Sequence, residues 1–193
     1  MKRFILLAVI FILLGVQMDL TAQTGNNRIL VVYFSWSGNA KALAGQIANA
    51  TGGDLFEVKT VTPYPTVYDE CTRVARQELD TNARPAISGS ITNIQQYNTV
   101  FLCYPNWWGT MPMALFTFLE TYNLSGKTIY PLVTHGGSRF GSSLDDIRRL
   151  CPGAVIGDGL SVSAFDRNPN DNPVVTVPNR DVTSWLRRIG MTR

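Results

Sequence analysis

The sequence predicts an α/β fold, a three-layer α/β/α sandwich around a five-stranded parallel sheet in the order 2-1-3-4-5. From residue 28 onward, apolar runs alternate with segments of helical periodicity, which is typical of a parallel sheet with crossover helices. The segments 28–35 and 99–104 contain unbroken apolar runs, as central strands covered on both faces require. The 193 residues, 45% hydrophobic and 16% charged, suit one domain with a sizeable core.

The elements follow one another in a regular order. We expect strands over residues 28–35, 55–59, 99–104, 128–134 and 154–162, and helices over residues 39–50, 66–79, 113–122, 142–150 and 179–189. The alternating pattern of the second strand suits a sheet edge. Pro131 is awkward in the fourth strand because it has no backbone donor, and residues 157–159 (Gly-Asp-Gly) interrupt the fifth.

Helix termini and faces carry further signals. Asn179 is expected to cap the last helix and Gly190 to end it. The helix over 66–79 is expected to place Val67, Cys71 and Val74 on one helical face.

The chain begins with the features of an export signal. Lys2 and Arg3 precede an unbroken apolar run over residues 4–16, and residues 20–22 offer a cleavage site before Gln23. The run is short for a membrane-spanning helix, although an uncleaved anchor is the alternative. We therefore expect residues 1–22 to be a signal peptide, the mature protein to be periplasmic or otherwise extracytoplasmic without stable membrane insertion, and residues 28–193 to form the functional domain.

Charge and cysteine content argue against two kinds of partner. Without residues 1–22, the chain keeps 15 Lys plus Arg and 13 Asp plus Glu, a net charge of +2. Near neutrality and the lack of a basic stripe with interleaved aromatics make nucleic acid a poor candidate. Cys71, Cys103 and Cys151 have no metal-ligand spacing, so no metal site is expected. We expect Cys71 and Cys103 to be buried. One disulfide among the three cysteines is the alternative, and the sequence does not show which two would form it.

The loop over residues 35–40 (Ser-Trp-Ser-Gly-Asn-Ala) has the composition of a phosphate cradle. It ends at a helix start, where free backbone N–H groups and a partial positive charge favour an anion. Ser35 and Ser37 add hydroxyl donors, and Gly38 permits close approach of the backbone. The loop matches neither GxxxxGK[ST] nor GxGxxG. An ordinary turn between strand and helix is the alternative interpretation.

The loop over residues 104–112 (Tyr-Pro-Asn-Trp-Trp-Gly-Thr-Met-Pro) brings two tryptophans to the end of the third strand. Leaving both Trp107 and Trp108 in water is costly. Either both pack into the core or an interface, or at least one stacks on a planar ligand. Gly109 gives this loop conformational freedom.

The loop over residues 134–141 (Thr-His-Gly-Gly-Ser-Arg-Phe-Gly) lets the backbone approach the edge of a ligand. His135, the one histidine of the chain, is better explained as a loop-organising residue than as an acid or base, because no catalytic partner is visible. Arg139 either borders the ligand or faces solvent.

The three loops are expected to converge, because the carboxyl ends of parallel strands meet at one edge of the sheet. Together they offer one phosphate cradle, one aromatic platform and one glycine-rich edge. Flavin mononucleotide (FMN) has one phosphate, one flat ring and one polar edge. The sequence therefore predicts FMN as the cofactor.

Three blocks resemble the flavodoxin family, in particular its small bacterial flavodoxin-like oxidoreductases: VVYFSWSGNAKALA, CYPNWWGTMPMALFTFLETYNLSGKTIYPLVTHGGS and GSSLDDIRRLCPGAVIGDGL. The resemblance implies noncovalently bound FMN and the flavodoxin-like strand order. The predicted cofactor-binding residues are Ser35, Trp36, Ser37, Gly38, Asn39, Ala40, Pro105, Asn106, Trp107, Trp108, Gly109, His135, Gly136, Gly137 and Ser138. In the family, the phosphate loop usually ends in threonine, where this chain has Ala40.

The resemblance implies electron transfer or the reduction of small acceptors. The partners would be a redox protein or a small electron acceptor and, for a reductase, NAD(P)H. Dedicated carriers of the family are usually strongly acidic, which this chain is not. A module without redox function that binds another phosphate compound is the alternative.

Overall fold

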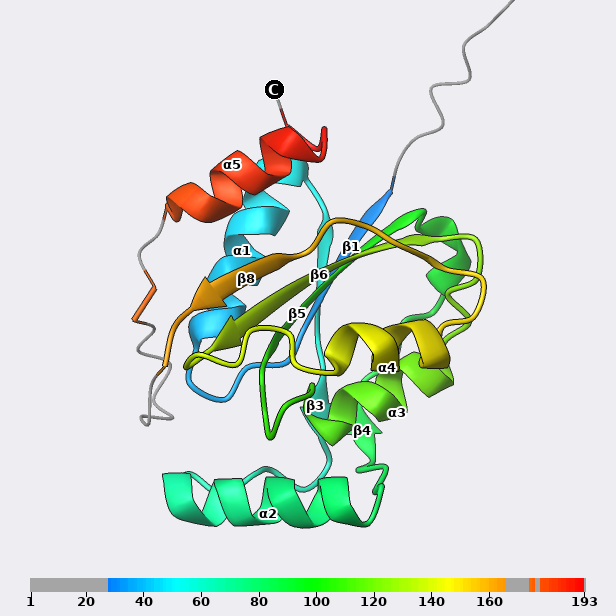
Figure 1. The fold of residues 1–193 in the computed structure, drawn as a ribbon. Coiled ribbons are helices and arrows are strands. Elements are labelled where there is room, and N and C mark those ends of the chain that lie inside the picture. Colours follow the sequence, from blue (N-terminus) through cyan, green and yellow to red (C-terminus); the bar gives the residue numbers. More distant parts are fainter. Residues whose placement is uncertain (1–27, 166–173, 176–177, 193) are drawn as a thin grey trace, which may run out of the picture.

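The computed structural model describes residues 28–165, 174–175 and 178–192, and the predicted signal peptide lies outside the described residues. A parallel sheet forms the centre of the molecule (Figure 1). Its strands are β1 (Ile29–Tyr33), β2 (Asp54–Glu57), β5 (Thr99–Pro105), β6 (Thr128–His135), β7 (Val155–Ile156) and β8 (Leu160–Ser163). The order is β2-β1-β5-β6-β7, with β8 also on β6. The predicted order 2-1-3-4-5 is therefore confirmed.

The fifth position of the sheet is shared by two short strands. β7 pairs with the start of β6 and β8 with its end, and residues 157–159 separate them. The carbonyl oxygen of Pro131 lies 3.0 Å from the point that a Cβ on Gly159 would occupy. Because N–H and C=O of a strand residue point the same way, the missing donor of Pro131 faces this break. The proline and the strand interruption thus accommodate each other.

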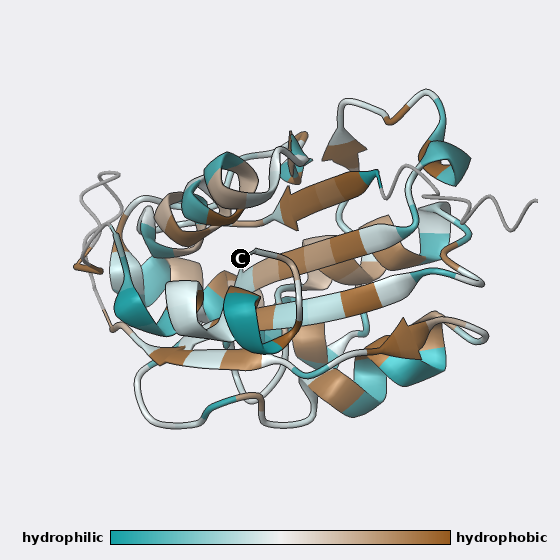
Figure 2. Ribbon diagram, turned by 90° about the horizontal axis from the view of Figure 1, so that it is seen from above, coloured by the Kyte–Doolittle hydropathy of each residue, from teal (hydrophilic) through white to brown (hydrophobic). Residues whose placement is uncertain are grey.

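Four helices cover the two faces of the sheet (Figure 1). The helices α1 (Asn39–Thr51) and α5 (Arg180–Arg188) lie on one face, and α3 (Met113–Thr121) and α4 (Ser143–Leu150) lie on the other. Alternate residues of each strand point to opposite faces, so that the sheet separates two apolar cores. Figure 2 shows the apolar colour concentrated on the strands. This is the predicted three-layer arrangement.

The helix termini agree with the sequence signals. Asn179 caps α5 by accepting the backbone N–H groups of Asp181 and Val182. Gly190 follows with a φ of 73°, and Trp185 is fully buried against the sheet. The helix α5 is therefore held on the sheet through its buried Trp185.

Two features differ from the prediction. A small antiparallel pair, β3 (Lys59–Thr60) and β4 (Ile87–Ser88), and a 3-10 turn, η1 (Ile94–Gln96), were not predicted. The helix α2 (Tyr68–Asp80) buries Cys71 and Ala75, whereas Val67 precedes it and is 55% exposed. Placing Val67 on the helical face of Cys71 was wrong because the helix begins at Tyr68, two residues later than predicted, and it stands beside a cavity instead of on the sheet.

The cysteines are free and buried, at positions 71, 103 and 151. Among the described residues, no helix has the length and apolar character needed to cross a membrane.

Candidate functional site

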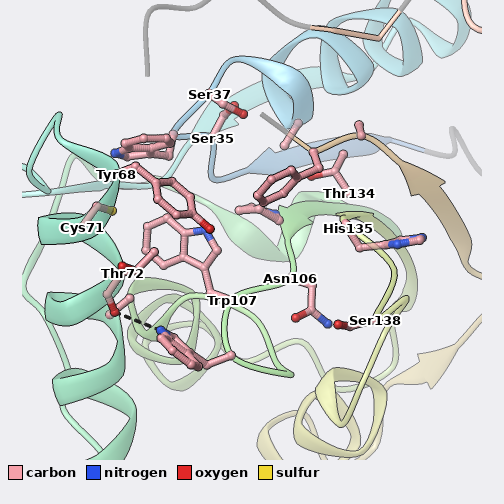
Figure 3. A pocket seen from close by; sticks show the side chains of 18 of the residues that line it. Ser35, Ser37, Tyr68, Cys71, Thr72, Asn106, Trp107, Thr134, His135 and Ser138 are labelled. Carbon is pink, nitrogen blue, oxygen red and sulfur yellow. Dashed lines mark hydrogen bonds between the residues drawn. The ribbon is translucent and has the colours of Figure 1, made fainter. Parts of the chain in front are cut away.

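The carboxyl ends of β1, β5, β6 and β8 surround a cavity of about 530 Å³ (Figure 3). This volume is within the range of small-molecule sites. Twelve of the fifteen predicted residues line it: Ser35, Trp36, Ser37, Ala40, Pro105, Asn106, Trp107, Trp108, Gly109, His135, Gly136 and Ser138. Gly38, Asn39 and Gly137 are not among the lining residues.

The phosphate loop joins β1 to α1 through a left-handed residue. Gly38 has a φ of 86°, which an L-amino acid rarely adopts. The first helical hydrogen bond runs from the N–H of Ala42 to the carbonyl of Gly38, at 2.9 Å. The backbone N–H groups before Ala42 therefore make no helical hydrogen bond and can donate to an anion.

Ser35 supplies the observation that tests whether the cradle suits an anion. Among the residues that the structure describes, its hydroxyl is the one buried side-chain oxygen or nitrogen without a hydrogen-bond partner. A buried unpaired hydroxyl costs about 1–3 kcal/mol. A phosphate in this cradle would accept its proton, so the loop fits the phosphate of FMN.

Asn39 supports this loop from behind. Its Nδ2 donates to the hydroxyl oxygen of Ser37 at 3.1 Å, and its Oδ1 accepts the N–H groups of Val174 and Val175. Because the oxygen of Ser37 already accepts this bond, its own proton is free to donate into the cavity.

The two tryptophans of the second loop have different environments. Trp107 is half-buried, and its ring packs edge-on against Phe34 and Tyr64, with centroid distances of 5.2 and 5.1 Å. Trp108 is 52% exposed and has a φ of 53°. Residues 107 and 110 exchange backbone hydrogen bonds, and Trp108 and Gly109 both have positive φ, as in a type I′ turn.

Trp108 reaches across the cavity mouth to α2. Its indole Nε1 donates to the carbonyl of Thr72 at 2.9 Å, the dashed line in Figure 3. The guanidinium of Arg76 lies over its ring, 5.4 Å from the centroid. The second loop is therefore fixed to α2 as well as to the sheet.

Asn106 joins the second and third loops. Its Nδ2 donates to the carbonyl of Arg139 at 2.8 Å, and its Oδ1 accepts the N–H of Gly109 at 3.0 Å. Although the backbone of Arg139 takes part in this link, its side chain is exposed and does not line the cavity. The solvent-facing interpretation of Arg139 agrees with this position.

His135 organises the third loop. Its Nδ1 accepts the N–H of Gly137 at 2.9 Å, so the other ring nitrogen, Nε2, carries the proton and lies 2.7 Å from the hydroxyl of Ser161. Burial and the nearby charge of Arg139 lower the pKa of His135, which favours this neutral form. In Figure 3 the ring points away from Trp107, as expected for a structural residue.

The sequence did not reveal one wall of the cavity. Tyr68, Cys71, Thr72 and Ala75 line it from α2, together with Thr134 at the end of β6 and Ala164 and Phe165 after β8. Burial raises the pKa of the Cys71 thiol to about 12, so it behaves as a small apolar group.

Phe165 closes the cavity beside the third loop. A Cβ on Gly136 would lie 3.0 Å from its ring, so glycine permits this contact. Because Phe165 follows the fifth strand, the rule that identified the other loops could have identified it too. The α2 residues had no comparable signal.

The fold and the site define a flavin-binding α/β protein. A family model described as Flavodoxin matches residues 28–169, and the chain belongs to the flavodoxin family. This membership confirms the predicted family and FMN as the cofactor. The residues present fit it, with the cradle around Ser35 for the phosphate and the loop with Trp107 for the ring.

Solved structures and one curated protein resemble this chain. A candidate flavoprotein from Bacteroides eggerthii is 30% identical, with a TM-score of 0.66, over 84% of this chain and 97% of the other. A Lactobacillus acidophilus flavoprotein in complex with FMN is 19% identical, covers 69% and 92%, has a TM-score of 0.60, and shows the fold alone.

An NAD(P)H dehydrogenase (quinone) from Acidovorax ebreus (strain TPSY) is 29% identical over 96 residues, which is 49% of this chain and 46% of the other. The chain thus spans about half the length of this curated relative.

Proposed function

We propose that this protein is an FMN-dependent oxidoreductase that uses NAD(P)H to reduce small planar acceptors of the quinone or nitro-compound class. The observation that carries the proposal is the wall that α2 forms across the cavity from the sheet loops. A carrier needs only an exposed flavin edge, whereas a reductase needs enclosed space for a second molecule beside the ring. We infer that the wall encloses such a space, because Tyr68, Thr72 and Ala75 line the same cavity as the aromatic loop.

FMN held in this cavity would supply two-electron chemistry, accepting a hydride equivalent from NAD(P)H and passing two electrons to the acceptor. For a quinone the balance is NAD(P)H, one proton and quinone in, NAD(P)⁺ and hydroquinone out. The chain provides the binding and the geometry. Ser35 and Ser37 would donate to the phosphate, Trp107 would present an aromatic surface, and the loops around them would exclude water from the ring.

Two observations outside the site support the reductase over the carrier. The Acidovorax ebreus relative is named NAD(P)H dehydrogenase (quinone). The chain also lacks the strong negative charge of dedicated carriers. Anaerobic mixing of FMN-loaded protein with NADH or NADPH is the test: rapid bleaching of the flavin, followed by recolouring with a quinone, supports the reductase. Bleaching by dithionite alone would contradict it and leave a carrier.

The second candidate is a phosphate-ligand module without redox function. Ala40 favours it, because the threonine usual at this position would add a hydroxyl. The paired tryptophans at the cavity oppose it, since a phosphate alone needs no aromatic surface. A purified protein that is yellow and releases FMN on denaturation excludes this candidate, and a colourless one that binds no added FMN supports it.

We also propose that the protein acts outside the cytoplasm, after removal of residues 1–22. The support is the charged start and the apolar run of the sequence. Mass spectrometry of the protein from the periplasmic fraction should find Gln23 at the N-terminus. An intact Met1 in the cytoplasmic fraction would contradict export.

A further inference from the structure

We propose that a groove on the far side of Trp108 binds the phosphate-bearing part of the dinucleotide that donates the hydride. The groove has a volume of about 500 Å³ and lies along α2, from Thr72 to Thr81. This inference rests on the proposed reductase function and names where its reductant is held. None of the predicted cofactor residues except Trp108 lines it.

The groove and the cavity share a wall. Thr72 and Trp108 line both, and the hydrogen bond between them holds the indole at the boundary. About half of Trp108 is exposed, so the residue is accessible to a molecule that extends over both compartments. A nicotinamide dinucleotide has this form, with a planar ring at one end and phosphates further along.

The charges of the groove suit phosphate. Arg73 is exposed, and it makes no ion pair within the part of the chain that the structure describes. Arg76 pairs with Asp80 through Nε and Nη2, at 2.9 and 2.8 Å, and lies over the indole of Trp108. Two guanidinium groups against one carboxylate leave the lining positive, and guanidinium binds phosphate through paired N–H donors.

The position of the groove beside the cavity favours a small dinucleotide over a protein partner. A protein partner with acidic side chains would meet the same two arginines, but it would not need a groove that adjoins the cavity at Thr72 and Trp108. A small molecule that carries both the reacting ring and the phosphates uses both features. We therefore assign the groove to the donor and not to a protein.

The test compares Arg73→Gln with Arg187→Gln in the full-length, FMN-loaded protein. Arg187 is an exposed arginine on α5, so the control removes the same charge elsewhere. Binding of ADP-ribose, measured by calorimetry, should weaken about tenfold in Arg73→Gln and stay unchanged in the control. The NADPH or NADH concentration for half-maximal flavin bleaching should rise by about the same factor. Bleaching by 1-benzyl-1,4-dihydronicotinamide, which carries no phosphate, should not change.

The outcomes separate the groove from the proposed function. ADP-ribose binding that depends on Arg73, without any bleaching by NADPH or NADH, supports the groove and contradicts the reductase. Bleaching that is the same in Arg73→Gln and Arg187→Gln supports the reductase and overturns the groove. Absence of ADP-ribose binding to the parent protein also overturns it. Equal FMN affinity in both variants shows that neither change disturbed the fold.

Discussion

The side-chain amide of Asn39 donates a hydrogen bond to the hydroxyl oxygen of Ser37 over 3.1 Å, while its carbonyl oxygen accepts two backbone N–H groups from residues 174 and 175. One buried residue thus links the phosphate loop, the direction of the Ser37 hydroxyl and the backbone of residues 174 and 175. Although Ala40 has no hydroxyl to contribute, Asn39 therefore gives this loop polar support.

Ser37→Ala and Gly38→Val should weaken FMN binding far more than riboflavin binding, because only FMN carries the phosphate. Loss of a hydrogen bond to a charged group costs about 1.5–3 kcal/mol, so the alanine variant should lose at least about tenfold in FMN affinity. The valine variant should be worse, since Gly38 has a φ of 86°. Fluorescence titration with both flavins measures this. Equal losses for the two flavins would contradict the assignment of the cradle.

Asn39→Asp tests the direction of the hydrogen bond. A carboxylate would accept the proton of Ser37 instead of donating to its oxygen, and it would bring a negative charge close to the phosphate. We expect a larger loss of FMN affinity than in Ser37→Ala, with riboflavin binding nearly unchanged. The bonds to residues 174 and 175 remain, because an aspartate oxygen still accepts them. FMN binding equal to that of the parent would show that Asn39 does not orient Ser37.

The two tryptophans should respond differently to substitution. Trp107→Ala should lower flavin affinity by about 1–3 kcal/mol if its ring stacks on the isoalloxazine. It should also lower the free energy of unfolding, since Phe34 and Tyr64 lose their edge-on partner. Trp108→Ala should spare the fold, because Trp108 is 52% exposed. Thermal melts and FMN titrations of both variants measure this, and unchanged FMN binding in both would make the pair purely structural.

His135 should make stability depend on pH in a defined direction. Burial and the charge of Arg139 lower its pKa below the usual 6.5, so the folded state favours the neutral ring. The stability it contributes is present above pH 6.5 and is lost as the pH falls through the lowered pKa of the folded state. Since His135 is the one histidine of the chain, NMR of the tag-free protein reports it without ambiguity.

The NMR titration should show the proton on Nε2 and a pKa below 6.5. In His135→Gln, the part of the acid destabilisation that falls between pH 6.5 and the pKa of the folded state should disappear. A pKa above 6.5, or a proton on Nδ1, would refute the hydrogen bond from the N–H of Gly137.

The fold was largely predictable, because the signals that specify a parallel sheet are local. Apolar runs identify the central strands, and helix caps such as Asn179 identify the ends of helices. Pro131 looked unsuitable for its strand, and the reason it is tolerated, the break opposite it, depends on which strand lies alongside. Pairing partners of this kind are a property of the tertiary structure.

The site was predictable where it follows from strand ends and unpredictable where it follows from packing. The three loops with Ser37, Trp107 and Gly136 meet because their strands are parallel and adjacent. The α2 wall had no such signal. Cys71 was expected to be buried and is, but its helix faces the cavity, which the periodicity of α2 alone cannot distinguish from a face packed on the sheet.

The central claim is that this cavity holds one FMN, with the phosphate in the cradle of Ser35 and Ser37. Titration of the flavin-free, full-length protein with FMN, followed by flavin and tryptophan fluorescence, tests it most directly. The account predicts one FMN per chain, quenching of tryptophan emission, and binding at least tenfold tighter than that of riboflavin, the difference coming from the phosphate. No saturable FMN binding, or equal affinity for FMN and riboflavin, would contradict it.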